Sequence, residues 1–134
     1  MAITVKTLID KNKKAFDAGF YIESINLSYI LINKALKQIV KHDLKQDSID
    51  QKIKTSNLIR FIKMETISRP ELKVTISKKV MKDILLFNTL YKSINKEIKY
   101  QFPEKKIADA SRLGMNCLVI LNNNLVKIKN NKVD

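Results

Sequence analysis

The chain has 134 residues, of which 45% are hydrophobic and 29% are charged, and its formal net charge is +13. This composition is typical of one folded domain and excludes an intrinsically disordered chain, which would have less apolar surface to bury. Only 2 Gly and 2 Pro occur, which favours long helices joined by short loops. The sequence therefore predicts a single all-α domain over residues 1–134, a bundle of four to five mostly antiparallel up-down helices.

Two helices are predicted in the first third of the chain. Apolar residues at helical spacing indicate a helix over residues 4–17, with Asn12 inside the apolar stripe and Gly19 placed to end it. A longer helix is expected over residues 20–44, because a wide apolar face runs along the whole segment. This second helix is predicted to be the central, most buried helix of the bundle.

A loop and a third helix are expected next. Residues 46–55 are polar and carry several aspartate and serine residues, as loops do. Thr55 or Ser56 can then cap a helix that is predicted to end at about Met64.

The fourth helix has a start signal of its own. The stretch SRPE at residues 68–71 has the form of a capping box with proline near the first helical position, so it predicts that a helix begins there. The β-branched residues 74–76 would interrupt that helix, and Ser77 can cap it again. Its main part is expected over residues 78–102, where Pro103 ends it.

The last predicted helix covers residues 104–127, where apolar residues follow a near-heptad series. Gly114 lies inside that series. Glycine costs about 1 kcal/mol of helix propensity relative to alanine, so Gly114 is expected to permit the close approach of another helix. Residues 128–134 are predicted to be a frayed tail.

The residues that usually carry catalysis are scarce. Cys117 is the only cysteine and His42 the only histidine, so the sequence predicts neither a metal cluster nor a Cys/His pair. Cys117 is expected to be buried as a small hydrophobic residue, and His42 to lie at the surface at a helix end. The acidic residues are scattered, and Gly19 and Gly114 cannot form a phosphate-binding loop. No catalytic residue, metal site or cofactor is predicted.

The single cysteine and the short apolar stretches bear on the expected cellular location of the protein. One cysteine excludes an internal disulfide and fits a reducing compartment. No apolar run has the length of a signal peptide core or of a membrane span. The expected location is the cytoplasm, with no membrane association.

A line of lysines is predicted on the second helix. Spacings of three, four and four place its members on one face. This candidate stripe for a polyanion consists of Lys34, Lys37, Lys41 and Lys45. It would follow a phosphate backbone, although a solvated face in any lysine-rich chain has the same pattern. A genome biased toward A and T would also supply much of the net charge.

A second polar line borders the apolar stripe of the fourth helix. Its spacings are four, three and four, and together with the neighbouring tyrosine it forms a candidate rim for a ligand or partner. The rim consists of Asn88, Lys92, Asn95, Lys99 and Tyr100. The alternative interpretation is a solvated flank without a ligand.

Three stretches of the chain resemble the HEPN (higher eukaryote and prokaryote nucleotide-binding) domain family. They are AGFYIESINLSYILINKALKQIV at residues 18–40, IKTSNLIRFI at residues 53–62 and LYKSINKEIKYQFP at residues 90–103. The family usually carries Arg-Asn, three residues, His and then an aromatic residue in the last stretch. Here Ile94 stands at the arginine position, Asn95 keeps the asparagine, Lys99 stands at the histidine position and Phe102 keeps the aromatic residue.

The resemblance implies a four-helix core, a homodimer and a prokaryotic or phage setting in defence or toxin–antitoxin systems. Active relatives cleave RNA with the arginine and the histidine, and a lysine with a pKa near 10 is a poor acid or base. We therefore expect a non-catalytic protein that binds RNA, a nucleotide or a protein partner. The alternatives are a ribonuclease that uses Asn95, Lys99 and Tyr100 instead, and a purely protein-binding module.

Overall fold

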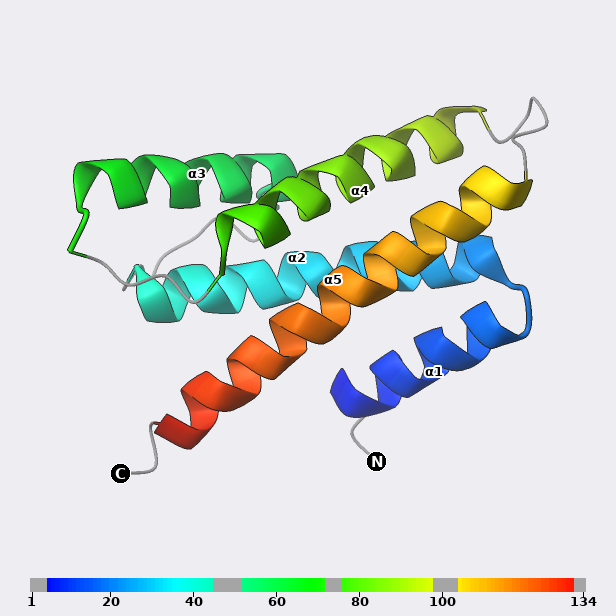
Figure 1. Ribbon diagram of the computed structural model, residues 1–134, viewed down its shortest axis with the longest axis horizontal. Helices are drawn as coiled ribbons and strands as arrows, with labels where there is room; N and C mark the ends of the chain where they lie inside the picture. Colours follow the sequence, from blue (N-terminus) through cyan, green and yellow to red (C-terminus); the bar gives the residue numbers. More distant parts are fainter. Residues whose placement is uncertain (1–4, 45–51, 72–75, 98–103, 132–134) are drawn as a thin grey trace.

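The computed structural model describes residues 5–44, 52–71, 76–97 and 104–131, and these ranges contain five α-helices and no strand. The helices are α1 (Val5–Asp17), α2 (Tyr21–Asp43), α3 (Thr55–Ser68), α4 (Lys78–Glu97) and α5 (Glu104–Asn131). They pack into one bundle (Figure 1). The predicted all-α helical bundle is confirmed.

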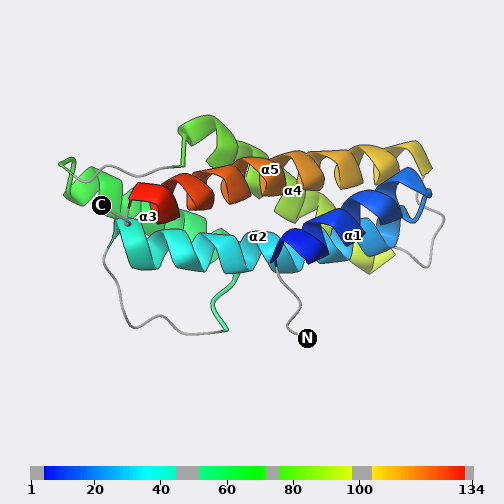
Figure 2. The ribbon, with the colours of Figure 1, turned by 90° about the horizontal axis from the view of Figure 1, so that it is seen from below.

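Helix α2 is the centre of the bundle, because each of the other four helices packs against it. Its most extensive contact is with α5, which crosses α2 and runs in the same direction (Figure 1). Consecutive helices are antiparallel except for α2 and α3. Figure 2 shows α5 lying over a layer that α1 and α2 form. The predicted role of the second helix is confirmed.

The apolar periodicity of the sequence becomes the core of this bundle. Its largest fully buried side chains come from α2, α3, α4 and α5 together, and each contributes about 1.5–3 kcal/mol on leaving water. On α2 they are Ile25, Ile32, Leu36 and Ile39. These four residues belong to the stripe that the sequence predicts, so packing rather than helix propensity holds α2 in place.

The turn between α1 and α2 has the geometry of a Schellman motif. Gly19 has φ 83°, and its N–H donates to the carbonyl of Phe16 at 3.0 Å. The N–H of Phe20 donates to the carbonyl of Ala15 at 2.8 Å. Glycine adopts this left-handed conformation without steric cost. Gly19 therefore ends α1 as predicted.

Helix α3 is joined to α2 at its first turn. Asn33 Nδ2 donates to Thr55 Oγ1 at 3.0 Å and to the carbonyl of Ile53 at 3.4 Å. Thr55 is buried there. The polar start of α3 is thus fixed by an amide from the central helix.

The predicted helix start at SRPE is wrong. Helix α3 continues past Met64 to Ser68, and Pro70 and Glu71 form a turn after it. Arg69 Nη2 and Nε donate to Glu65 Oε2 at 2.8 Å and 3.0 Å, which stabilises this last turn. Because proline disfavours helical geometry at the residue before it, Pro70 acts as a stop signal.

Helix α4 instead begins directly after Ser77, the second capping residue that the sequence predicts. Ser77 Oγ accepts a hydrogen bond from the N–H of Val80 at 3.2 Å, so the predicted recapping by Ser77 is confirmed. Ile76 is buried, whereas residues 72–75 lie outside the described ranges. The predicted end of this helix at residue 102 also lies outside them, and α4 is described as far as Glu97.

Helix α5 is longer than the sequence pattern indicates. It extends to Asn131, so residues 128–131 of the predicted frayed tail are helical, and residues 132–134 lie outside the described chain. Within the described helices, none combines the length and the apolar character needed to cross a membrane.

Gly114 brings α4 and α5 together. A Cβ atom added at Gly114 would lie 2.5 Å from Cε1 and 2.7 Å from Cζ of Phe87. Phe87 is itself fully buried, so its ring occupies the space that a side chain at position 114 would need. The predicted close approach of two helices at Gly114 is confirmed.

Candidate functional site

The outward side of α2 carries lysines. Lys34 and Lys41 are exposed and Lys37 is half-buried, so three members of the predicted stripe share one face. We call these three residues the lysine face. Lys45 lies outside the described residues.

Asp43, the acidic residue of α2 that follows these lysines in the sequence, does not share their face. Between residues 34 and 44 the only acidic residue is Asp43, which is buried and pairs with His42, whose Nδ1 lies 2.8 Å from Asp43 Oδ1. The opposite side of α2 is packed into the core through Leu36 and Ile39. The core therefore fixes the outward orientation of the lysine face.

Asn88 does not lie at a solvated rim. It is 5% exposed, and among the described residues no group hydrogen-bonds to its Oδ1. The reason is its position, since Asn88 follows the buried residues Met81 and Ile84 by seven and four positions and so shares their face. The prediction that Asn88 belongs to an exposed ligand rim is corrected.

The remaining rim residues are only partly described. Lys92 and Asn95 are exposed. Asn95 Nδ2 donates to the carbonyl of Tyr91 at 2.9 Å, a bond within its own helix. Lys99 and Tyr100 lie outside the described residues. The structure thus brings Lys92 and Asn95 to one exposed end of α4 and separates Asn88 from them.

Ile94 lies at the position where the resemblance expects an arginine. It is fully buried and belongs to the core. A buried isoleucine contributes packing and can neither bind a phosphate nor transfer a proton. Phe102 lies outside the described residues.

Two tyrosines stack beside this segment. The rings of Tyr29 and Tyr91 lie 3.9 Å apart between centroids at an interplanar angle of 4°, joining α2 to α4. Burial, and to a smaller extent Tyr29, raises the pKa of Tyr91 above its usual value of 10.0. Tyr91 therefore keeps its proton at neutral pH and is unsuited to act as a base.

A buried polar network links α1 and α2. Asn12 Nδ2 donates to Ser28 Oγ at 2.7 Å, and Ser24 Oγ donates to Asn12 Oδ1. All three residues are buried, so the network stabilises the packing of the two helices and is closed to a ligand. The feature of the sequence that pointed to this network was Asn12 inside the apolar stripe of the first helix.

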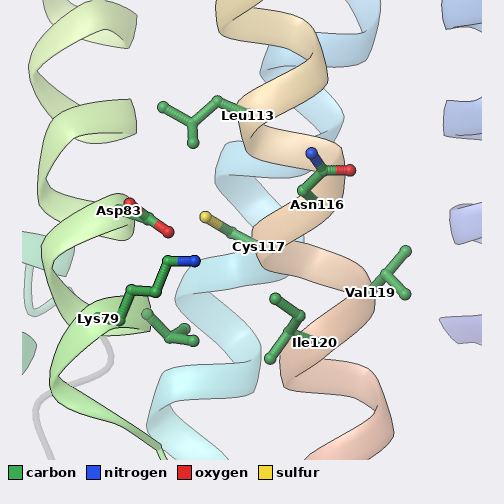
Figure 3. Close-up of a pocket in the computed structure, with 8 residues that line it drawn as sticks. Lys79, Asp83, Leu113, Asn116, Cys117, Val119 and Ile120 are labelled. Atoms are coloured by element: carbon green, nitrogen blue, oxygen red, sulfur yellow. The ribbon is translucent and has the colours of Figure 1, made fainter.

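The sequence interpretation missed a groove between α4 and α5. Its volume is about 380 Å³. Lys79 and Asp83 point from α4 toward α5, while Leu113, Cys117 and Ile120 point from α5 toward α4 (Figure 3). The available signal in the sequence was the run of five apolar residues at positions 117–121, which is wider than one buried stripe of a helix and includes three residues that line the groove.

Cys117 lies beneath this groove and is 2% exposed. Burial, assisted by the charge of Asp83, raises the pKa of the thiol to about 12. The thiol is therefore protonated at neutral pH and a poor nucleophile. Its predicted burial is confirmed.

No three His, Cys, Asp or Glu side chains gather into a possible metal site in the described parts of the chain. Comparison of the chain with protein-family models, with curated proteins and with solved structures finds no match.

Proposed function

We propose that this protein binds RNA through the lysine face of α2 and does not cleave it. The observation that carries the proposal is the arrangement of Lys34, Lys37 and Lys41 along one outward face of α2, opposite the side on which Leu36 and Ile39 are buried. At 1.5 Å per residue, Lys34 and Lys41 are separated by about 10 Å along the helix, enough to meet two or three phosphates.

Two further observations support this function. The net charge of +13 attracts a polyanion from every direction, which raises the rate of encounter. The resemblance to HEPN domains supports RNA as that polyanion, and it also supports a setting in prokaryotic or phage defence or in a toxin–antitoxin pair. The burial of Ile94 at the arginine position supports binding without catalysis.

The test is a salt titration of RNA binding. Fluorescence anisotropy with a labelled single-stranded RNA measures the affinity of the wild type and of the K34Q/K37Q/K41Q variant. Each phosphate contact contributes about 0.7 to the slope of log K against log salt, so the slope should fall by about 2. At 0.1 M salt this corresponds to roughly a 100-fold loss of affinity.

A matched control separates the lysine face from net charge. The K6Q/K11Q/K13Q variant removes three exposed lysines of α1 and has the same net charge, +10 instead of +13. It should bind RNA within about threefold of the wild type, because it leaves the three direct contacts in place. Equal losses in both variants would refute a dedicated site on α2. Cleavage of the labelled RNA by the wild type would refute a non-catalytic function.

A further inference from the structure

Exposed apolar side chains lie along both sides of the groove between α4 and α5. Leu86 is 52% exposed and Ile120 is 41% exposed, and exposed apolar side chains that gather along a groove, rather than singly, mark interaction sites. Leu86 does not line the groove itself, but it follows Asp83 by three and Lys79 by seven positions, so its position lies on the same side of α4 just beyond the groove. Leu113 and Ile120 form the α5 side, also seven positions apart. The two sides make an apolar channel between antiparallel helices.

The packing beneath this channel is fixed. The contact between Gly114 and Phe87 holds α4 and α5 close together, and Cys117 is buried below the surface. The apolar side chains above are therefore presented by rigid helices. Such a shape accepts the side chains of another helix laid along it, in the manner of helix-in-groove recognition.

The charges around the channel identify the kind of helix that fits. Lys78, Lys79 and Lys82 are exposed along the first turns of α4, whereas Asp83 is the only carboxylate among the residues that line the groove. A second copy of this chain would bring the same lysines and another +13 charge against them, and like charges at an interface oppose association. A helix with acidic flanks would instead be attracted.

We propose that the α4/α5 channel docks an amphipathic helix of a partner protein, with an apolar face toward Leu86, Leu113 and Ile120 and acidic residues toward the lysines of α4. This site lies on different helices from the lysine face and does not depend on RNA binding. The protein then has two separate surfaces, one for a polyanion and one for an acidic helix.

The probe for this site is a synthetic helical peptide of about 18 residues, with leucines at spacings of three and four and glutamates on the flanks. Isothermal titration calorimetry with the wild type should detect binding. The same peptide with lysines in place of the glutamates, and a scrambled acidic peptide without an apolar face, should bind at least about tenfold more weakly.

Two substitutions locate the binding surface. Ile120→Glu should weaken binding of the acidic peptide about tenfold or more, since it replaces apolar contact with a repelling carboxylate. Ile67→Glu is the matched control, because Ile67 is 80% exposed and lies on α3. It should bind as the wild type does. Both positions are exposed, so each variant should fold, and circular dichroism checks that it does.

Three results would overturn the proposal. One is absence of binding by the acidic peptide, and another is equal binding by the wild type and Ile120→Glu. The third is a homodimer in sedimentation velocity that Ile120→Glu dissociates, which would assign the channel to a second copy. The K34Q/K37Q/K41Q variant should bind the peptide normally, so failure of the RNA proposal and failure of this one are distinguishable.

Discussion

Replacing Gly114 by alanine tests whether the close approach of α4 and α5 holds the bundle together. The added Cβ would lie 2.5 Å and 2.7 Å from two ring atoms of Phe87, whereas carbon atoms in contact prefer about 3.5–4.0 Å. The helices or the ring must therefore move by about 1 Å. Phe87 is fully buried and has no open space to enter at the surface.

Two opposing terms set the expected size of the effect. Overpacking a core costs about 1–3 kcal/mol. Alanine gains about 1 kcal/mol over glycine in helix propensity. We expect Gly114→Ala to lower the free energy of unfolding by about 1 kcal/mol net, measured by urea denaturation followed by circular dichroism. A variant more stable than the wild type would refute the reasoning, because propensity would then outweigh the contact.

A double-mutant cycle identifies the atoms responsible. Phe87→Leu removes the ring that a Cβ at position 114 would meet, so Gly114→Ala should cost less in that background. The expected coupling energy is about 0.5–2 kcal/mol. Additive effects of the two substitutions would show that Phe87 is not the obstacle.

Gly19→Ala provides the comparison. Among the described residues, no atom would lie within 4 Å of its added Cβ, but its φ of 83° is strained for alanine and costs about 1–2 kcal/mol. Gly19→Asn should recover part of this loss, since asparagine tolerates the left-handed conformation. No such recovery is expected for Gly114→Asn, where the obstacle is steric.

The other predictions concern buried groups. Asn12→Ala should lower the free energy of unfolding by about 1–3 kcal/mol in urea denaturation, because Ser24 and Ser28 lose their buried partner; an unchanged midpoint would contradict this. Cys117 should resist a thiol reagent at pH 8 in the folded protein and react in urea. Because the pKa of Cys117 is raised from 9.0 to about 12 in the folded protein, its contribution to stability is present below pH 9 and is lost as pH rises from 9 to 12; Cys117→Ala should remove that part of the pH dependence. Ile94→Arg introduces the arginine that a HEPN domain would carry at this position. It should lower the free energy of unfolding by about 3 kcal/mol or more, because the charge would be buried without a partner. A variant as stable as the wild type would argue against this packing of Ile94.

Local sequence signals were reliable where one physical effect dominated. The apolar stripe of α2 predicted the buried side of the central helix, since a stripe that wide can only be shielded from water by other helices. Gly19 ended α1, and Ser77 capped α4, because each depends on bonds within a few residues. The prediction that a helix begins at SRPE was wrong because the same residue types occur in a capping box and at a helix end. The ion pair between Glu65 and Arg69 stabilises the end of α3 there.

The sequence by itself determined the helical class, the central helix and the placement of the lysines on one face. Only the tertiary structure decided which polar residues meet solvent. Asn88 and Lys92 lie one turn apart on the same side of α4, yet Asn88 is buried and Lys92 exposed, because the neighbouring helices cover that side at Asn88 and leave it open at Lys92. The tertiary structure also decided where the groove lies. Its two sides come from α4 and α5, and the residues that line it are up to 41 positions apart in the sequence. A periodic pattern along one helix carries no information about which face of another helix it meets.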